Sequence, residues 1–565
     1  MRAAALPAFA RRPAASRSTL WLLSRPAVLA LAMAALLGAV PPLGEFPIND
    51  DWLYSLTVRS LLEEGRLHIP AWTAPSLVLQ AYWGALFAQL FGFSFTVLRA
   101  STLALAAIAL LGFYLLLREL LDPGRALLGA LLLLVNPLYV TLSYSFMSDV
   151  PFLALTFWAL LCYTRALRGT RPSSAWLAAG SALAGGAYLV RQVGVILPLA
   201  ALGGLLLCRG WRSALGPRQL AAVVGPFLPA LLLLRSFQAE SGPIGNDAVG
   251  WTVAFWSKHG PGMAGVALAR LAESLSTLGL FTLPLAVGLL AAPGGLRPGR
   301  RQRWLAGALL LMFGVGLFAH VAIFDRGWLL PYAKDVLSAR GFLGRDHLNG
   351  TLPESVVIPD GALAVATAVA ILSGGLLALA TAALPRETLH GPAAVLLLFG
   401  LASLILTLLF HDFFDRYLLG ILPSGLLVML LLLRPARWGG ALTLAGVALL
   451  AAWSIWWERD YLERRTALWQ AAQALVERGI SAEQIDGGAE WNGWYRGRSL
   501  LAEAVEKGKA DSKGGQLRGF VQRGLDPTGA RWAVAYARSG DAPASRVLVV
   551  VPYGRGQRAI AVQRS

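Results

Sequence analysis

Residues 98–117 read LRASTLALAAIALLGFYLLL, in which Arg99 is the single charged side chain. Hydrocarbon offers no partner to a free backbone N–H or C=O group, so an apolar stretch of this length is expected to cross a bilayer as a helix. Runs of the same kind recur along the first 457 residues. We expect about thirteen transmembrane helices, over residues 26–42, 98–117, 126–142, 149–164, 175–190, 193–208, 219–235, 266–292, 304–323, 361–384, 392–410, 417–433 and 439–457.

The composition supports a membrane protein. Of 565 residues, 56% are hydrophobic and 14% are charged, which is more apolar than a soluble domain. The net charge of +18 does not indicate nucleic-acid binding, because the basic residues concentrate in short loops between apolar runs. We therefore expect membrane lipid as a partner and no nucleic acid.

The side of each loop follows from its arginines. With a cytoplasmic N-terminus, every cytoplasmic loop is basic, and the odd number of helices sends the C-terminus outside. The arginines concerned are Arg118, Arg125, Arg165, Arg168, Arg171, Arg209, Arg212, Arg218, Arg297, Arg300, Arg301, Arg303, Arg386, Arg434 and Arg437. We predict a multi-pass protein of a bacterial inner membrane, with its C-terminus in the periplasm.

The first external loop, residues 43–97, is long enough to hold helices of its own. Its second helix-like stretch, PSLVLQAYWGALFAQLFG (75–92), is apolar and aromatic. We expect this helix to lie along the membrane surface, because a crossing there would invert the arginine bias of all later loops. Two further external loops cover residues 236–265 and 324–360.

The chain becomes charged and soluble in character after residue 457. We predict a helix around 460–478, a loop at GGAEWNGWYRG (487–497) and two or three strands near RWAVAYA, SRVLVVVPY and AIAVQ. The predicted domains are therefore 1–457, a transmembrane domain, and 458–565, a small external α/β domain. Trp491, Trp494, Tyr495 and Trp532 are expected to pack in its core, with stacking on sugars as the alternative.

Acidic residues stand at the external ends of two predicted helices. FPINDDWLY (46–54) places Asp50 and Asp51 after the first helix, and SYSFMSDVPFL (143–153) places Asp149 at the start of another. Taken singly, these side chains are typical helix caps. Together, on the face opposite the cytoplasm, they are candidates for acid–base chemistry.

Two arginines lie on the same external side, against the general charge bias. Arg191 sits in AYLVRQVG (187–194) at a tight turn, and Arg416 sits in HDFFDRYLLGILP (411–423) at the start of a helix. Because topology does not require positive charge there, both are candidates for binding phosphate.

These motifs together resemble the GT-C glycosyltransferases. The resemblance rests on the first helix followed by DD and then Tyr, on LFGFSFTVLR (90–99), on NPLYVTLSYSFMSDVPF (136–152) and on DRYLLGILP (415–423). More narrowly, the chain looks like glycosyltransferase family 39, which includes protein O-mannosyltransferases and bacterial aminoarabinose transferases. The likeness covers the membrane part and implies a GT-C-like fold, mainly α.

The resemblance implies a role for each matching residue. Asp50 would be the base, Asp51 stands where the family often has Glu, and Asp149 matches the second acid. Tyr54 would position substrate, while Arg191, Arg416 and Tyr417 match positions near the donor phosphate. Gly420 departs from the family pattern, where Pro is common, although Pro423 is present.

The predicted function is transfer of a monosaccharide from a polyprenyl-phosphate-linked donor to an acceptor hydroxyl on the external face, the acceptor being a lipid, glycan or protein. The first alternative is a lipid-linked sugar carrier or flippase, which should line a path through its helices with polar residues. The second is a non-catalytic assembly or sensor protein. The sequence predicts no definite cofactor. A divalent metal ion stays open, although His320, His347 and His411 lack ligand spacing.

Overall fold

The structure is a computed structural model of the 565-residue chain. It describes residues 19–70, 73–214, 216–241, 248–291, 299–324, 327, 329–333, 335–338, 341–342, 358–433, 437–506, 530–538, 546–554 and 557–563. His347 of the sequence prediction lies outside these residues.

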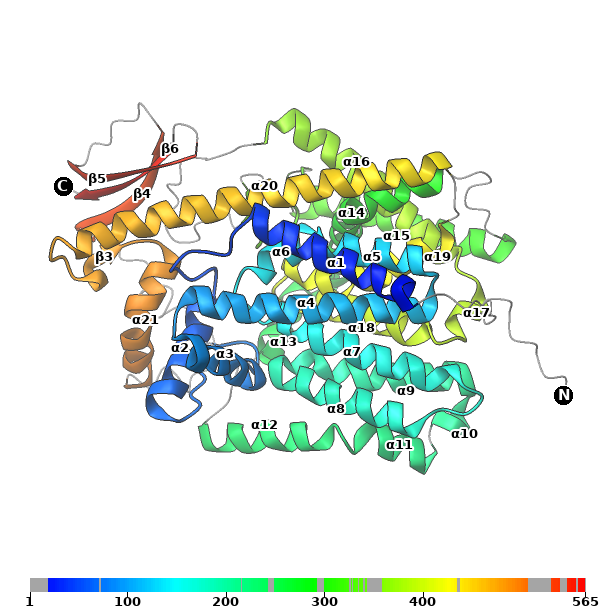
Figure 1. The fold of residues 1–565 in the computed structure, drawn as a ribbon. Helices are drawn as coiled ribbons and strands as arrows, with labels where there is room; N and C mark the ends of the chain where they lie inside the picture. The colour runs from blue at the N-terminus through cyan, green and yellow to red at the C-terminus, as the bar shows by residue number, and fades with distance from the viewer. Residues whose placement is uncertain are drawn as a thin grey trace.

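The membrane part is a bundle of apolar helices (Figure 1). Its helices are α1 Thr19–Ala39, α4 Phe95–Leu120, α5 Pro123–Leu134, α6 Pro137–Ser143, α7 Asp149–Arg168, α8 Ser174–Val190, α9 Ile196–Arg209, α10 Trp211–Ala214, α11 Pro217–Val224, α12 Leu228–Ser241, α13 Ala248–His259, α14 Met263–Leu290, α15 Arg300–Phe324, α16 Asp360–Ala382, α17 Arg386–Leu389, α18 Ala394–Leu409, α19 Leu422–Leu432 and α20 Arg437–Val476. Short 3-10 turns add η2 Gln192–Val195, η3 Gly260–Gly262 and η4 Asp415–Gly420. Helix α4 packs on α7, α7 on α8, and α14 on α15, α16 and α20.

The number of membrane crossings is set by helix length and composition. Among the described residues, seven helices are long and apolar enough to span, or nine if the bent pairs α5 with α6 and α11 with α12 each form one span. Five shorter apolar helices follow the same pattern, including α3 Val78–Phe91. The count of thirteen requires every shorter helix except α3 to cross as well, and it stays a prediction.

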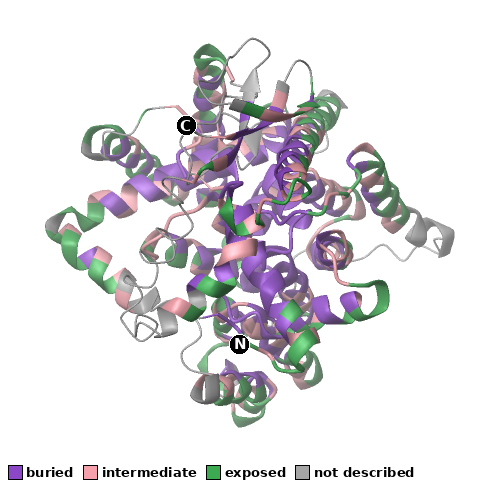
Figure 2. Ribbon diagram, turned by 90° about the vertical axis from the view of Figure 1, so that its left-hand side faces the viewer, coloured by how far each residue is buried: buried purple, intermediate pink, exposed green. Residues whose placement is uncertain are grey.

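One end of the bundle carries the remaining elements (Figure 1). They are α2 Asp51–Glu64, α3, η5 Ala482–Gln484, α21 Ala489–Glu506 and the strands β3 Ile485–Asp486, β4 Trp532–Arg538, β5 Arg546–Tyr553 and β6 Gln557–Gln563. The start of α1 lies at the opposite end. Viewed onto the first end, buried residues gather towards the centre and exposed ones towards the rim (Figure 2). The helices of the first predicted external loop and the C-terminal elements therefore share one end of the molecule.

The described strands of the C-terminal part form a sheet in the order β3-β4-β6-β5, with β3 parallel to β4 and the other neighbours antiparallel. The strands predicted near residues 531, 545 and 559 are thus confirmed. A separate short pair, β1 Leu337–Ser338 and β2 Gly341–Phe342, lies between α15 and α16.

Two details differ from the sequence expectation. The stretch GGAEWNGWYRG was predicted as a loop, and this was wrong: most of it is the first half of α21. Its glycines disfavour an isolated helix, but Gly493 and Gly497 let α21 approach the ring of Trp52 on α2. The predicted division at residue 457 falls inside the continuous helix α20, and the division into domains stays a prediction.

Candidate active site

The two adjacent acids after α1 have different surroundings. Asp51 is buried, and its carboxylate accepts two backbone hydrogen bonds, at Oδ1 from Ile48 (2.6 Å) and at Oδ2 from Phe146 (2.9 Å). Asp50 is exposed at the N-cap position of α2, where its side chain makes no capping hydrogen bond. The Asp50 carboxylate is therefore accessible, whereas that of Asp51 fastens the loop to the segment before α7.

The surroundings of Asp51 also favour the protonated form of its side chain. Burial raises the pKa of Asp51 to about 7, although the hydrogen bonds from Phe146 and Ile48 and the charge of Arg99 act in the opposite direction. A carboxyl group that is buried and held by backbone donors is suited to orienting a loop.

Arg99 also holds the loop between α1 and α2 in place. The side chain is buried, and its Nε donates to the carbonyl of Tyr144 at 2.7 Å. Its Nη1 donates to the carbonyls of Pro42 (3.0 Å) and Gly44 (3.2 Å), and its Nη2 donates to that of Phe46 (3.2 Å). One guanidinium thus joins the start of the first external loop to the segment that precedes Asp149.

Asp149 and Arg191 form an ion pair. Asp149 is the first residue of α7, and Arg191 directly follows α8 with an extended backbone. Nη1 of Arg191 donates a hydrogen bond to Oδ1 of Asp149, and both side chains are largely buried. Oδ2 of Asp149 is buried without a hydrogen-bond partner among the described residues. One oxygen of this acid thus engages a cation, and the other makes no hydrogen bond within the part of the chain that the structure describes.

Arg416 and Tyr417 lie in η4, between α18 and α19. The Tyr417 ring centre is 5.8 Å from the guanidinium carbon of Arg416 and 5.9 Å from that of Arg191, so the two cations share one aromatic ring. Burial opposes the charge of Arg416, but nearby carboxylates, Asp335 first among them, outweigh burial and raise its pKa. The site therefore keeps this cation charged.

Electrostatic interactions tie the predicted positions to one place. Burial raises the pKa of Tyr54, whose phenol also interacts with the charges of Asp50, Arg416, Arg191 and Asp149. The structure thus brings together residues that stand more than 350 positions apart in the chain, from Asp50 to Tyr417. Asp51 lies beside them on the buried side of the loop.

Two further acids of this site did not enter the sequence prediction. Asp335 forms an ion pair with Arg416, between Oδ2 and Nε at 3.2 Å. Asp415 is fully buried, and its carboxylate accepts hydrogen bonds from the backbone N–H groups of Val336 (3.1 Å) and Leu337 (2.6 Å). The available signal was weak: one acid lies in a loop that the sequence predicts to be external, and the other precedes Arg416.

A metal ion would need several donor side chains close together. Among the residues that the structure describes, no three or more His, Cys, Asp or Glu side chains gather as metal ligands would. His320 contacts Glu273, Nδ1 to Oε1 at 2.6 Å, and His411 contacts Asp412, Nε2 to Oδ2 at 3.2 Å. Asp51, Asp149, Asp335 and Asp415 instead face arginines or backbone N–H groups.

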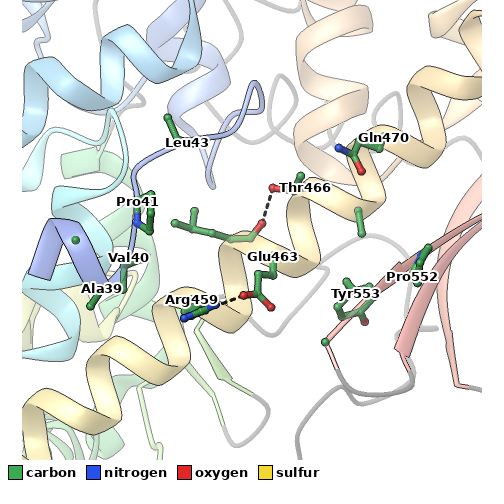
Figure 3. A pocket seen from close by; sticks show the side chains of 14 residues that line it. Ala39, Val40, Pro41, Leu43, Arg459, Glu463, Thr466, Gln470, Pro552 and Tyr553 are labelled. Carbon is green, nitrogen blue, oxygen red and sulfur yellow. Dashed lines mark hydrogen bonds and ion pairs between the residues drawn. The ribbon is translucent and has the colours of Figure 1, made fainter.

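An open groove of about 600 Å³ lies elsewhere on the same end of the molecule. It is lined by the end of α1 and the following Pro41 and Leu43, by α20 near Arg459 and Glu463, and by Tyr553 at the end of β5 (Figure 3). Arg459 and Glu463 pair with each other at 2.8 Å. The groove contains none of the predicted site residues.

The aromatic residues of the C-terminal part pack within the fold. Trp491 is fully buried, and its Nε1 donates to the carbonyl of Ala482 at 3.0 Å. Trp494 stacks on Phe93 with ring centres 6.1 Å apart and meets Phe95 edge-on at 4.7 Å. Core packing is thus confirmed for Trp491, whereas Trp494 packs α21 against the loop before α4.

Comparisons with known proteins give one family match and several solved structures. Residues 75–233 match the family described as Dolichyl-phosphate-mannose-protein mannosyltransferase. No curated protein matches the chain.

Two solved structures are similar at low identity. The crystal structure of ArnT from Cupriavidus metallidurans bound to undecaprenyl phosphate is 15% identical, with 96% of this chain and 98% of that one covered and a TM-score of 0.38. AglB from Archaeoglobus fulgidus, in complex with an inhibitory peptide and a dolichol-phosphate, is 13% identical, with 92% and 70% covered and a TM-score of 0.44. The family match confirms the resemblance predicted from the sequence: through residues 75–233, the chain is related to the GT-C membrane glycosyltransferases.

Proposed function

We propose that this chain is a membrane glycosyltransferase that moves a monosaccharide from a polyprenyl-phosphate-linked donor to an acceptor hydroxyl on the external face of the membrane. The observation that carries the proposal is the convergence of Asp50, Asp149, Arg191 and Arg416 around Tyr54 and Tyr417. An exposed carboxylate and two guanidiniums at the end of a helical bundle are the groups that such a transfer needs.

The reaction breaks the bond between the anomeric carbon of the sugar and a phosphate oxygen. The acceptor oxygen forms the new bond to that carbon and gives its proton to the Asp50 carboxylate, which is exposed and engages no capping N–H. The bonding electrons leave with the phosphate oxygen. Asp51 supports Asp50 by holding the loop, and Oδ2 of Asp149 accepts a hydrogen bond from a substrate hydroxyl.

Arg191 and Arg416 stabilise the departing phosphate. Negative charge on the leaving oxygen grows as the bond to the sugar breaks, so fixed guanidiniums stabilise the transition state more than the bound donor. Both arginines are held in place, Arg191 by Asp149 and Arg416 by Asp335. A donor carried on a lipid phosphate agrees with the description of the matched family.

The orientation of the protein belongs to the same proposal. The candidate site lies at the end of the bundle that carries α2, α3, α21 and the sheet (Figure 1). We assign this end to the periplasmic side of a bacterial inner membrane and the start of α1 to the cytoplasmic side, on the distribution of arginines.

The test is sugar transfer in membranes supplied with radiolabelled polyprenyl-phosphate monosaccharides. Wild type is compared with Asp50→Asn, Asp149→Asn and the matched control Asp360→Asn, whose carboxylate is exposed at the start of α16. We expect Asp50→Asn to lower transfer about a hundredfold or more and Asp360→Asn to leave it unchanged. Wild-type rates in both site variants, or no consumption of any donor, would refute the assignment and favour a lipid-linked sugar carrier.

A further inference from the structure

Asp335 connects the two halves of the candidate site. It lies in the external segment between α15 and α16, and its side chain is 6% exposed. Its Oδ2 pairs with Nε of Arg416 at 3.2 Å, while its Oδ1 accepts a long hydrogen bond from Nδ2 of Asn49 at 3.4 Å. Asn49 immediately precedes Asp50, so one carboxylate touches both the cation and the loop of the proposed base.

Asp415 fixes the backbone on which Asp335 stands. The Asp415 carboxylate accepts hydrogen bonds from the backbone N–H groups of Val336 and Leu337, the residues directly after Asp335. A buried carboxylate held by two backbone donors leaves the segment little freedom. Because Asp415 also adjoins Arg416 in the chain, Asp335 and Arg416 are held to one another twice, by side chains and by backbone.

The pairing decides which way Arg416 points. A guanidinium is a rigid planar fork, so a carboxylate at Nε orients the remaining N–H groups. The rings of Phe414 and Tyr417 lie 5.0 and 5.8 Å from the guanidinium carbon. Nη1 and Nε of Arg416 are both buried without a hydrogen-bond partner within the described part of the chain, so the contact of Nε with Oδ2 of Asp335 is an ion pair. The free end of the fork is thus available to a ligand oxygen.

The charge of Arg416 has competing partners. Asp149 and Asp50 also interact with it, although less than Asp335 does. Without Asp335, the guanidinium would be drawn towards those two carboxylates, one of which is the proposed base. A pair with Asp335 therefore keeps the cation oriented and keeps it away from Asp50.

We infer that Asp335 is a positioning residue, which holds Arg416 so that Nη1 meets the phosphate of the donor, with Asp415 as its backbone anchor. The inference rests on the proposed function. It adds the external segment before α16 to the donor site and gives that segment a specific task.

A double-mutant cycle tests the inference on the purified full-length chain. Binding of polyprenyl monophosphate and the rate of sugar transfer are measured for wild type, Asp335→Asn, Arg416→Gln and the double variant. We expect Asp335→Asn to lower transfer by about 10- to 100-fold, the usual cost of a misplaced group. If Asp335 acts through Arg416, the double variant is no worse than Arg416→Gln alone. The inference would be overturned if the rate losses of the two single variants multiplied in the double variant, or if Asp335→Asn kept the wild-type rate.

Two further variants separate positioning from folding. Asp335→Glu keeps the charge and should recover part of the loss, whereas the control Asp360→Asn, which removes an exposed carboxylate, should behave as wild type. If the wild type transfers sugar but the cycle is additive, only this inference fails. If no donor is consumed, the proposed function fails, and the binding cycle with polyprenyl monophosphate still decides whether Asp335 and Arg416 act as one unit.

Discussion

Nη1 of Arg191 donates a hydrogen bond to Oδ1 of Asp149, and this contact joins the residue after α8 to the first residue of α7. Both side chains are largely buried at the end of the bundle that carries the candidate site. The pair gives Arg191 a fixed direction beside the ring of Tyr417. In the proposed function, a cation held in this way needs no reorientation when the donor phosphate binds.

Replacement of Arg191 should therefore affect chemistry more than folding. We expect Arg191→Gln to lower the turnover number about 10²- to 10³-fold, as loss of a transition-state donor does. Arg191→Lys should recover part of the rate, because it keeps the charge but not the fork. The measurement is transfer from labelled donor at matched expression, with Arg171→Gln, an exposed arginine of the loop between α7 and α8, as the control. If Arg191→Gln and the control Arg171→Gln lost the same share of the transfer rate, the prediction would be contradicted.

The burial of Asp51 predicts a dependence of stability on pH. Its pKa is raised to about 7, so the folded chain holds this proton more tightly than the unfolded chain. The stabilisation is complete below about pH 4 and is lost as the pH rises to about 7. We expect the unfolding temperature of the purified chain to fall across that window, and Asp51→Asn to flatten the fall.

A second buried acid contributes to the same window. Burial and the charge of Asp335 raise the pKa of Asp415 to about 7, so part of the slope should persist in Asp51→Asn. Asp360→Asn, at an exposed position, should keep the full slope. A slope that Asp51→Asn leaves unchanged would show that Asp51 titrates normally.

The buried guanidinium of Arg99 is expected to stabilise the loop that carries the two acids. Arg99→Gln removes donors from four backbone carbonyls, and we expect a loss of about 3–5 kcal/mol, typical of breaking a buried charged network. Arg99→Lys should fail to restore stability, because an ammonium cannot reach the same set of acceptors. Thermal unfolding in detergent measures both variants, and full recovery by Lys would disprove the geometric argument.

The contact between α21 and α2 depends on two glycines. A Cβ atom at Gly493 or Gly497 would lie 2.4 Å from the ring of Trp52. Either Gly→Ala substitution should separate the helices, at a cost of about 1–3 kcal/mol, and should speed proteolysis of the C-terminal part. Gly440→Ala is the matched control, because a Cβ there meets open space. Equal protease resistance in all three variants would contradict this account.

The proposed orientation in the membrane predicts at which positions of the chain a fused reporter enzyme is active. A reporter enzyme that is active only outside the cytoplasm should be active when fused after Ser565 and inactive when inserted after Arg171. The physical reason is the concentration of arginine in the loops assigned to the cytoplasm. The reverse pattern of activity would invert the topology and move the candidate site to the other side.

The sequence by itself determined the membrane character of the chain, the helix α3 and the strands of the C-terminal part. These features depend on apolar length and on alternation within single segments, which are local properties of the chain. The sequence also placed Asp50, Asp149, Arg191 and Arg416 at helix ends, and the family resemblance assigned their roles. Their meeting at one end of the bundle follows from where the helices begin and end.

Only the tertiary structure decided how the two adjacent acids differ and which other residues join them. The Asp51 carboxylate accepts a hydrogen bond from the backbone N–H of Phe146, 95 residues away in the chain. The Asp415 carboxylate accepts hydrogen bonds from backbone N–H groups 78 and 79 residues away. The helix at GGAEWNGWYRG likewise packs two of its glycines against Trp52, which lies far back in the chain. No local pattern encodes such partners, since a buried polar group is stabilised by whatever the fold places beside it.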